Sequence, residues 1–176
     1  METPLLDVLL AYDAWATRQL LVECCALPPG QFVQELGIGP GSLERTAAHL
    51  VGAALFFAAR FSRRPPGPRP DRDGGGHTAT ELLAQYDIAA PQLDVAVRDA
   101  VSRHALTDPL QWNDTDEPNV PPEDCPSYAV ALAHMFDHGV QHRVEGIVML
   151  RRLGVDKRLE WHPFDWDMQR YVPAAE

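Results

Sequence analysis

The sequence predicts an all-α fold, a four-helix bundle that occupies residues 1–176 as a single domain. Four long segments carry apolar residues at helical spacing, and stretches rich in proline, glycine and aspartate separate them. Patterns typical of strands are almost absent. With 176 residues, of which 45% are hydrophobic, the chain is long enough to bury one core.

The first two helices have clear end signals. A stripe of leucines predicts the first helix over residues 4–26, and Pro28, Pro29 and Gly30 end it. The second helix is expected over residues 42–61, because Ser42 is a good N-cap residue and a proline-rich stretch follows Phe61.

The last two helices are bounded in the same way. The third is expected over residues 79–103, where Thr78 and Glu81 have the spacing of a capping box. The fourth is expected over residues 127–153, and Gly154 then takes the position at which many helices end.

Two long connections and a tail complete the predicted domain. Residues 60–77 and 107–126 are expected to be loops, and residues 155–176 a C-terminal tail packed on the bundle. Aromatic side chains in a polar tail need a surface that buries them. Those expected to dock are Phe164, Trp166 and Tyr171.

Charge and hydropathy argue against nucleic acid and membranes as partners. The net charge of −10 repels phosphate backbones and anionic membranes, so we expect neither nucleic acid nor a membrane as partner. The arginines of residues 60–72 lie in a proline- and glycine-rich stretch that we interpret as a solvated loop. No apolar window is long enough for a membrane span, and the N-terminus lacks a basic signal region. A cytoplasmic protein is therefore expected.

Histidines are the candidate functional residues. In "AHMFDHGVQHRVEG", His134, His138 and His142 follow one another at four-residue intervals. On a helix, residues four apart are neighbours, so His138 and His142 can reach one metal ion, whereas His134 lies two turns from His142. A third ligand must come from elsewhere. His49 lies in the middle of the second predicted helix, in an apolar setting where an imidazole needs a partner.

Three imidazoles predict an open, catalytic metal site, because structural zinc sites have four protein ligands. Neutral ligands leave the charge of the ion in place, so a bound water or thiol loses its proton more easily. Two reaction classes follow, hydrolysis by a metal hydroxide and transfer by a metal-bound thiolate. A di-iron carboxylate site is not indicated, because the helices lack its Glu-x-x-His pairs.

Four segments, in this order, resemble the DinB/YfiT-like family of metalloenzymes. "YDAWATRQLL" is similar to the first-helix signature of the family, and "LPPGQFVQELGIGPGSLERTAAHLVGA" to the approach to its second helix. "HMFDHGVQHRVE" resembles its His-x-x-Asn-His-x-x-His-His-Arg-Gly-Gln segment, and "FDWDMQRY" its tail. The resemblance covers nearly the whole chain. Departures from the family pattern are Thr17, Asp137, Gln141, Val144 and Glu145.

The resemblance implies a four-helix bundle, often a homodimer, that holds one divalent ion, usually zinc or nickel. Its ligands correspond to His49, His138 and His142, and His134 falls at a position that is not a ligand. Characterised relatives include transferases and isomerases that depend on bacillithiol, mycothiol or glutathione.

Our leading hypothesis is a metal-dependent enzyme that activates a low-molecular-weight thiol for attack on a small-molecule substrate. Glu145 is the candidate general base, or a partner that orients a ligand imidazole. Arg45 and Arg143 are candidate substrate-binding groups that would meet a carboxylate of the thiol, or else ordinary ion-pair partners. The alternatives are a small metal-dependent hydrolase and a metal-binding stress protein without turnover.

Overall fold

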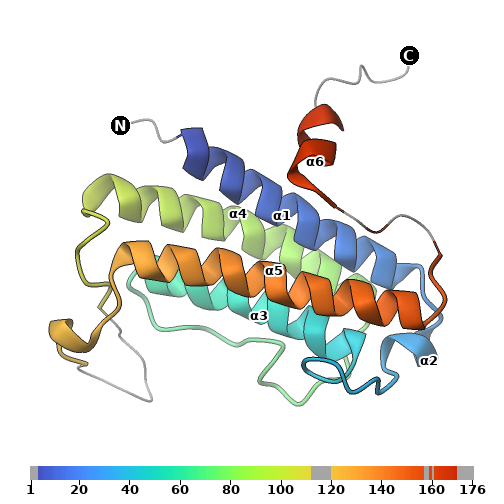
Figure 1. Cartoon of the computed structure of the whole chain (residues 1–176). Coiled ribbons are helices and arrows are strands. Elements are labelled where there is room, and N and C mark those ends of the chain that lie inside the picture. The colour runs from blue at the N-terminus through green and yellow to red at the C-terminus, as the bar shows by residue number, and fades with distance from the viewer. Residues whose placement is uncertain (1–3, 112–119, 157–158, 160, 170–176) are drawn as a thin grey trace.

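Four long helices form the bundle of the computed structural model, which describes residues 4–111, 120–156, 159 and 161–169 (Figure 1). Within these residues no strand is present, and the predicted all-α fold is confirmed. Each long helix has the predicted bounds to within one residue at either end. They are α1 (Pro4–Cys25), α3 (Leu43–Phe61), α4 (Ala79–Arg103) and α5 (Tyr128–Arg152).

Capping side chains explain why the boundaries were predictable. The hydroxyl of Ser42 accepts a hydrogen bond from the backbone N–H of Arg45 at 3.2 Å. Thr78 and Glu81 form the predicted capping box, in which each side chain binds the backbone N–H of the other. Gly154, with φ of 87°, follows the end of α5.

Three short elements lie outside the four predicted helices. Each begins with a proline. Proline suits the first turn of a helix because an N–H at that position would have no partner within the helix. Segments of three to seven residues are too short for a periodic pattern, so sequence reasoning did not predict them as helices. They are α2 (Pro29–Phe32), the 3₁₀ helix η1 (Pro122–Asp124) and α6 (Pro163–Gln169).

The packing order of the helices determines which side chains can meet. α3 lies between α4 and α5, and α1 packs against the same two helices from the other side. α1 and α5 run in one direction, and α3 and α4 run in the opposite one (Figure 1). Because α3 and α4 are parallel neighbours, residues 62–78 must return along the length of the bundle before α4 begins. We call residues 62–78 the strap.

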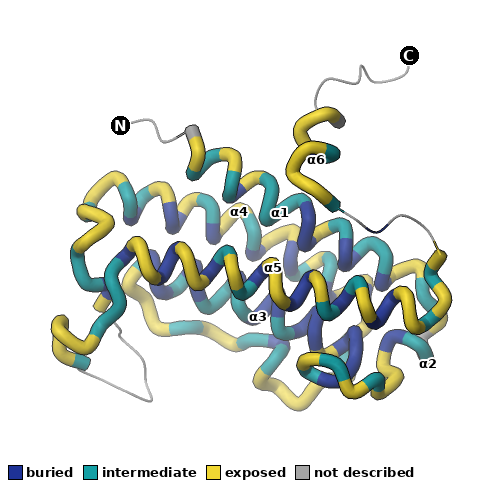
Figure 2. Tube along the Cα trace, viewed as in Figure 1, coloured by how far each residue is buried: buried dark blue, intermediate teal, exposed yellow. Residues whose placement is uncertain are grey.

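The core lies along the inner faces of the four helices. Buried positions alternate with exposed ones along each helix, as the banding in Figure 2 shows. Deeply buried apolar residues come from every long helix and include Leu21, Val51, Leu82, Val97, Met149 and Leu150. No helix among the described residues is both long and apolar enough to cross a membrane.

The C-terminal segment contacts α1 through one of its predicted aromatic anchors. Trp166 is 9% exposed, and its ring lies 6.2 Å from that of Tyr12. The Tyr12 hydroxyl donates a hydrogen bond to the carbonyl of Trp161 at 2.7 Å. The expectation for Phe164 was wrong, since this residue is 82% exposed. In a helix, side chains two positions apart in the sequence point about 200° away from each other. α6 therefore cannot turn both residue 164 and residue 166 towards the bundle. Tyr171 lies outside the described residues.

Candidate metal centre

Three histidines from two helices converge at the side of the bundle. His49 comes from α3, and His138 and His142 come from α5. One ring nitrogen from each residue lies within 4.8 Å of the other two. The Nε2 atoms of His49 and His138 are 2.9 Å apart, although the residues are separated by 89 positions in the sequence. The structure therefore brings together the three residues that sequence reasoning selected.

The fourth histidine of interest lies outside this group. His134 is exposed, and its ring contacts those of Phe57 at 5.9 Å and His138 at 5.8 Å. Because residue 134 lies two helical turns before residue 142, His134 is not grouped with the other three, as predicted.

Burial favours the neutral imidazoles that bind metals. The pKa of His138 is lowered to about 4, first by burial and then by the neighbouring imidazoles. Burial and His142 also lower the pKa of His49, while the hydrogen bond to Asp71 opposes this shift. Both side chains are accordingly neutral at pH 7, with a lone pair on one ring nitrogen. His49 is less enclosed than its apolar sequence context suggested, with 35% of its side chain exposed.

Glu145 contacts a histidine of the cluster directly. Its Oε2 atom lies 2.6 Å from Nδ1 of His142, and Gln141 donates a hydrogen bond to its Oε1 at 3.4 Å. An ionised carboxylate has no proton to donate, so the imidazole must donate from Nδ1. That tautomer leaves the lone pair on Nε2. Gly39 provides the space for the carboxylate, because a side chain at residue 39 would overlap it.

Asp71 makes the corresponding contact with His49, and sequence reasoning missed it. Its Oδ2 atom lies 3.4 Å from Nδ1 of His49, and only 10% of the side chain is exposed. The interpretation of this stretch as a solvated loop was wrong at Asp71 and at Arg69, whose side chain is 14% exposed. It was also wrong at Arg60, which belongs to α3 and is 4% exposed, so the loop begins after Phe61. No signal in the sequence indicated the contact, because a loop has no periodicity that tells which side chains face inward.

The two predicted substrate-binding arginines are in different environments. Arg45 is 55% exposed at its side chain and pairs with Glu35. Arg143 is buried between α5 and α1, where one of its nitrogens lies 2.5 Å from Asp13 and 2.9 Å from Thr17. The role of both arginines in substrate binding stays a prediction.

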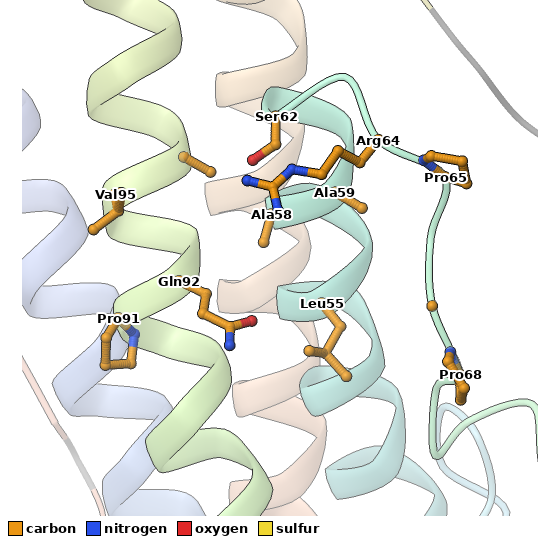
Figure 3. Close-up of a pocket in the computed structure, with 12 residues that line it drawn as sticks. Leu55, Ala58, Ala59, Ser62, Arg64, Pro65, Pro68, Pro91, Gln92 and Val95 are labelled. Carbon is orange, nitrogen blue, oxygen red and sulfur yellow. The ribbon is translucent and has the colours of Figure 1, made fainter.

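Two pockets large enough for small molecules flank α3. One, of about 340 Å³, adjoins the cluster and is lined by His49, Asp71, Arg45, Glu44 and three glycines of the strap, among others. The other, of about 740 Å³, lies between α3, α4 and the strap, with Arg64 reaching back over α3 towards Ser62 (Figure 3). It contains none of the clustered histidines, so the smaller pocket is the one that belongs to the centre.

The chain matches a known protein family over most of its length. The DinB family matches residues 1–168, which include all three clustered histidines and the whole four-helix bundle. A search of curated proteins found no match.

Proposed function

The chain belongs to the DinB family, and on that premise we propose that it is a divalent-metal-dependent enzyme that activates a low-molecular-weight thiol. The observation that supports this function is the convergence of three imidazole nitrogens within 4.8 Å. In this proposal His49, His138 and His142 hold one ion, zinc or nickel. Neutral imidazoles in a group of three suit either ion and leave a position open for a reactant.

A metal at this site would act as a Lewis acid that holds a bound thiol as thiolate. The protein side chains would orient the ligand histidines, take up the proton of the thiol and bind the reactants. Glu145 keeps His142 in the tautomer that binds a metal, or takes the proton of the incoming thiol. We propose the pocket of about 340 Å³ beside His49 as the place where the small reactants bind.

Arg45 lines this pocket, and in this proposal it exchanges its exposed partner Glu35 for a carboxylate of the thiol. Arg143 would act on the thiol only if it left its buried partners, so Arg45 is the stronger of the two candidates. A homodimeric state, which the family resemblance implies, and the cytoplasmic location expected from the sequence also belong to this proposal.

The experiment that tests the function uses protein loaded with Zn²⁺ or Ni²⁺. It is incubated with an aryl chloride and, in turn, with glutathione, mycothiol and bacillithiol, and the thioether product is measured by mass spectrometry. In this reaction the thiol gives up its proton, which passes to solvent, a carbon–sulfur bond forms, a carbon–chlorine bond breaks, and chloride leaves. Product that appears with one thiol and disappears in His138→Ala supports the proposal.

The same assay separates the alternatives. Cleavage of a panel of esters and amides without any thiol, dependent on the same histidines, would indicate a hydrolase that uses metal hydroxide. Bound metal with no turnover in either assay would favour the non-catalytic metal-binding protein.

A further inference from the structure

We infer that Asp71, on the strap, is a positioning residue of the metal centre that fixes the orientation of the His49 imidazole. The inference rests on the metal binding proposed for His49, His138 and His142. It goes beyond that proposal because it gives the strap, which lies outside the helices that carry the ligands, a part in building the site.

The contact between Asp71 and His49 determines which ring nitrogen is available. Oδ2 of Asp71 lies 3.4 Å from Nδ1 of His49, so an ionised carboxylate makes Nδ1 the donor. The lone pair then lies on Nε2, which is the atom 2.9 Å from Nε2 of His138. Asp71 therefore directs the metal-binding nitrogen of His49 towards the other two histidines. Carboxylates that accept from the second ring nitrogen of a ligand histidine are common at metal sites.

Asp71 is itself held in place by Arg69. Nε of Arg69 lies 3.2 Å from Oδ1 of Asp71, and a terminal nitrogen of the same guanidinium lies 3.4 Å from Oδ2. The guanidinium also lies over the ring of Phe56, 5.2 Å from its centroid. A planar guanidinium held against an aromatic ring loses much of its freedom, so the carboxylate has a fixed partner.

A stripe on α3 provides the surface on which this part of the strap lies. His49, Gly52 and Phe56 are spaced by three and four residues and so share one face of the helix. A side chain at Gly52 would overlap the carboxylate of Asp71. The glycine is thus explained by space and not by helix propensity, since an alanine at this position would favour the helix itself.

The same arrangement occurs a second time in the centre. His142 has the Glu145 carboxylate at its Nδ1, and Gly39 leaves the space that this carboxylate fills. Two of the three clustered imidazoles therefore have a carboxylate on Nδ1 and a glycine behind the carboxylate. A single contact of this kind is unremarkable in a loop, but its repetition on two ligands from two helices points to a shared task.

The test compares Asp71→Ala with Gly52→Ala, which pushes the carboxylate away without removing it. Affinity is measured with Co²⁺ in competition with a chromophoric chelator, and the visible spectrum of bound Co²⁺ reports the geometry of the ligands. Each variant is expected to weaken Co²⁺ binding by about 10- to 100-fold and to change the spectrum. The double variant should bind about as weakly as the worse single variant, because both changes break one contact.

Matched controls come from the same strap. Gly67→Ala adds a methyl group that meets no atom within 4 Å, and Asp73→Ala removes an exposed carboxylate two residues further along. Both should bind Co²⁺ like the wild type. Asp71→Asn keeps an acceptor oxygen, so it should restore most of the wild-type spectrum. Helical circular dichroism of every variant establishes that the bundle is intact.

Two results would overturn the inference, and they differ. If the wild type binds no Co²⁺, or if His138→Ala binds it equally well, the three-histidine site is wrong and the role of Asp71 falls with it. If the wild type binds Co²⁺ through the histidines while Asp71→Ala and Gly52→Ala match its affinity and spectrum, the site stands and only the role of Asp71 is refuted.

Discussion

Oε2 of Glu145 lies 2.6 Å from Nδ1 of His142, one turn earlier on the same helix. This contact engages the carboxylate with an imidazole of the cluster before any reactant arrives. A residue whose oxygen is already used in this way is better suited to orient the ring than to take a proton from elsewhere.

The first prediction concerns this carboxylate. Glu145→Ala should weaken metal binding by about 10- to 100-fold, because His142 loses the acceptor that fixes its tautomer. Glu145→Gln should weaken it less, since the amide oxygen still accepts a hydrogen bond. Competition titration with Co²⁺ measures both, and Asp137→Ala, which removes an exposed carboxylate from the same helix, is the control. A Gln variant with full affinity and no turnover would instead identify Glu145 as the general base.

The second prediction concerns the ligands. His49→Ala, His138→Ala and His142→Ala should each lose most of the bound metal, as measured by elemental analysis of dialysed protein. His134→Ala is the control and should keep it, because residue 134 lies two turns from residue 142 on α5. Loss of metal in His134→Ala with retention in His49→Ala would contradict the assignment.

The third prediction is that the bundle does not need its metal to fold. The buried apolar residues of all four long helices pack against one another independently of the histidines. Removal of metal with a chelator should therefore leave the helical circular dichroism signal at room temperature unchanged. Collapse of that signal would show a structural metal of the kind found in zinc fingers.

The fourth prediction concerns the structural role of Arg143. Asp13→Ala leaves the buried guanidinium without its ion-pair partner, although Thr17 still accepts from it, and should lower the free energy of unfolding by about 3–5 kcal/mol in urea titrations. Asp87→Ala removes the partner of Arg18 in an exposed pair and should change it by less than about 1 kcal/mol. Equal effects of the two substitutions would mean that the buried pair of Asp13 and Arg143 contributes little to stability.

The fifth prediction concerns pH. Partial burial lowers the pKa of His77, but the hydrogen bond to Asp73 and its charge outweigh burial, and the nearby Glu44 adds to them, so the pKa lies above its usual value. A raised pKa means that protonation stabilises the folded state. This stabilisation is full below the unfolded pKa of about 6.5 and disappears as pH rises through the folded pKa.

His77→Gln should therefore be less stable than the wild type at about pH 5.5 and nearly equal to it at about pH 9. Thermal unfolding at the two pH values measures the difference. A constant difference between the two proteins would show that the ion pair with Asp73 does not form in solution.

Local signals explain how much of this structure was predictable. Ser42, Thr78 and Gly154 have physical effects that act within a few residues, so the ends of the long helices follow from the sequence. The histidine cluster was predictable because helical spacing relates His138 to His142, and because His49 stands in an apolar segment.

The missed features depend on contacts between distant segments. Asp71 meets His49 only because α3 and α4 are parallel and the strap runs back along the helix. Arg143 meets Asp13 because α1 packs on α5, with Gly139 leaving room between the two helices. Neither contact has a spacing that can be read from the chain.

The separation of the histidines along the chain has a consequence for biosynthesis. A nascent chain that ends after α4 contains His49 but neither His138 nor His142, so it cannot form the cluster. The site becomes complete only when α5, the last long helix to be synthesised, docks against α3. If the three histidines bind a metal as proposed, a chain whose bundle has already assembled would acquire it. The choice of ion would then depend on the metals present where folding finishes, after translation of α5.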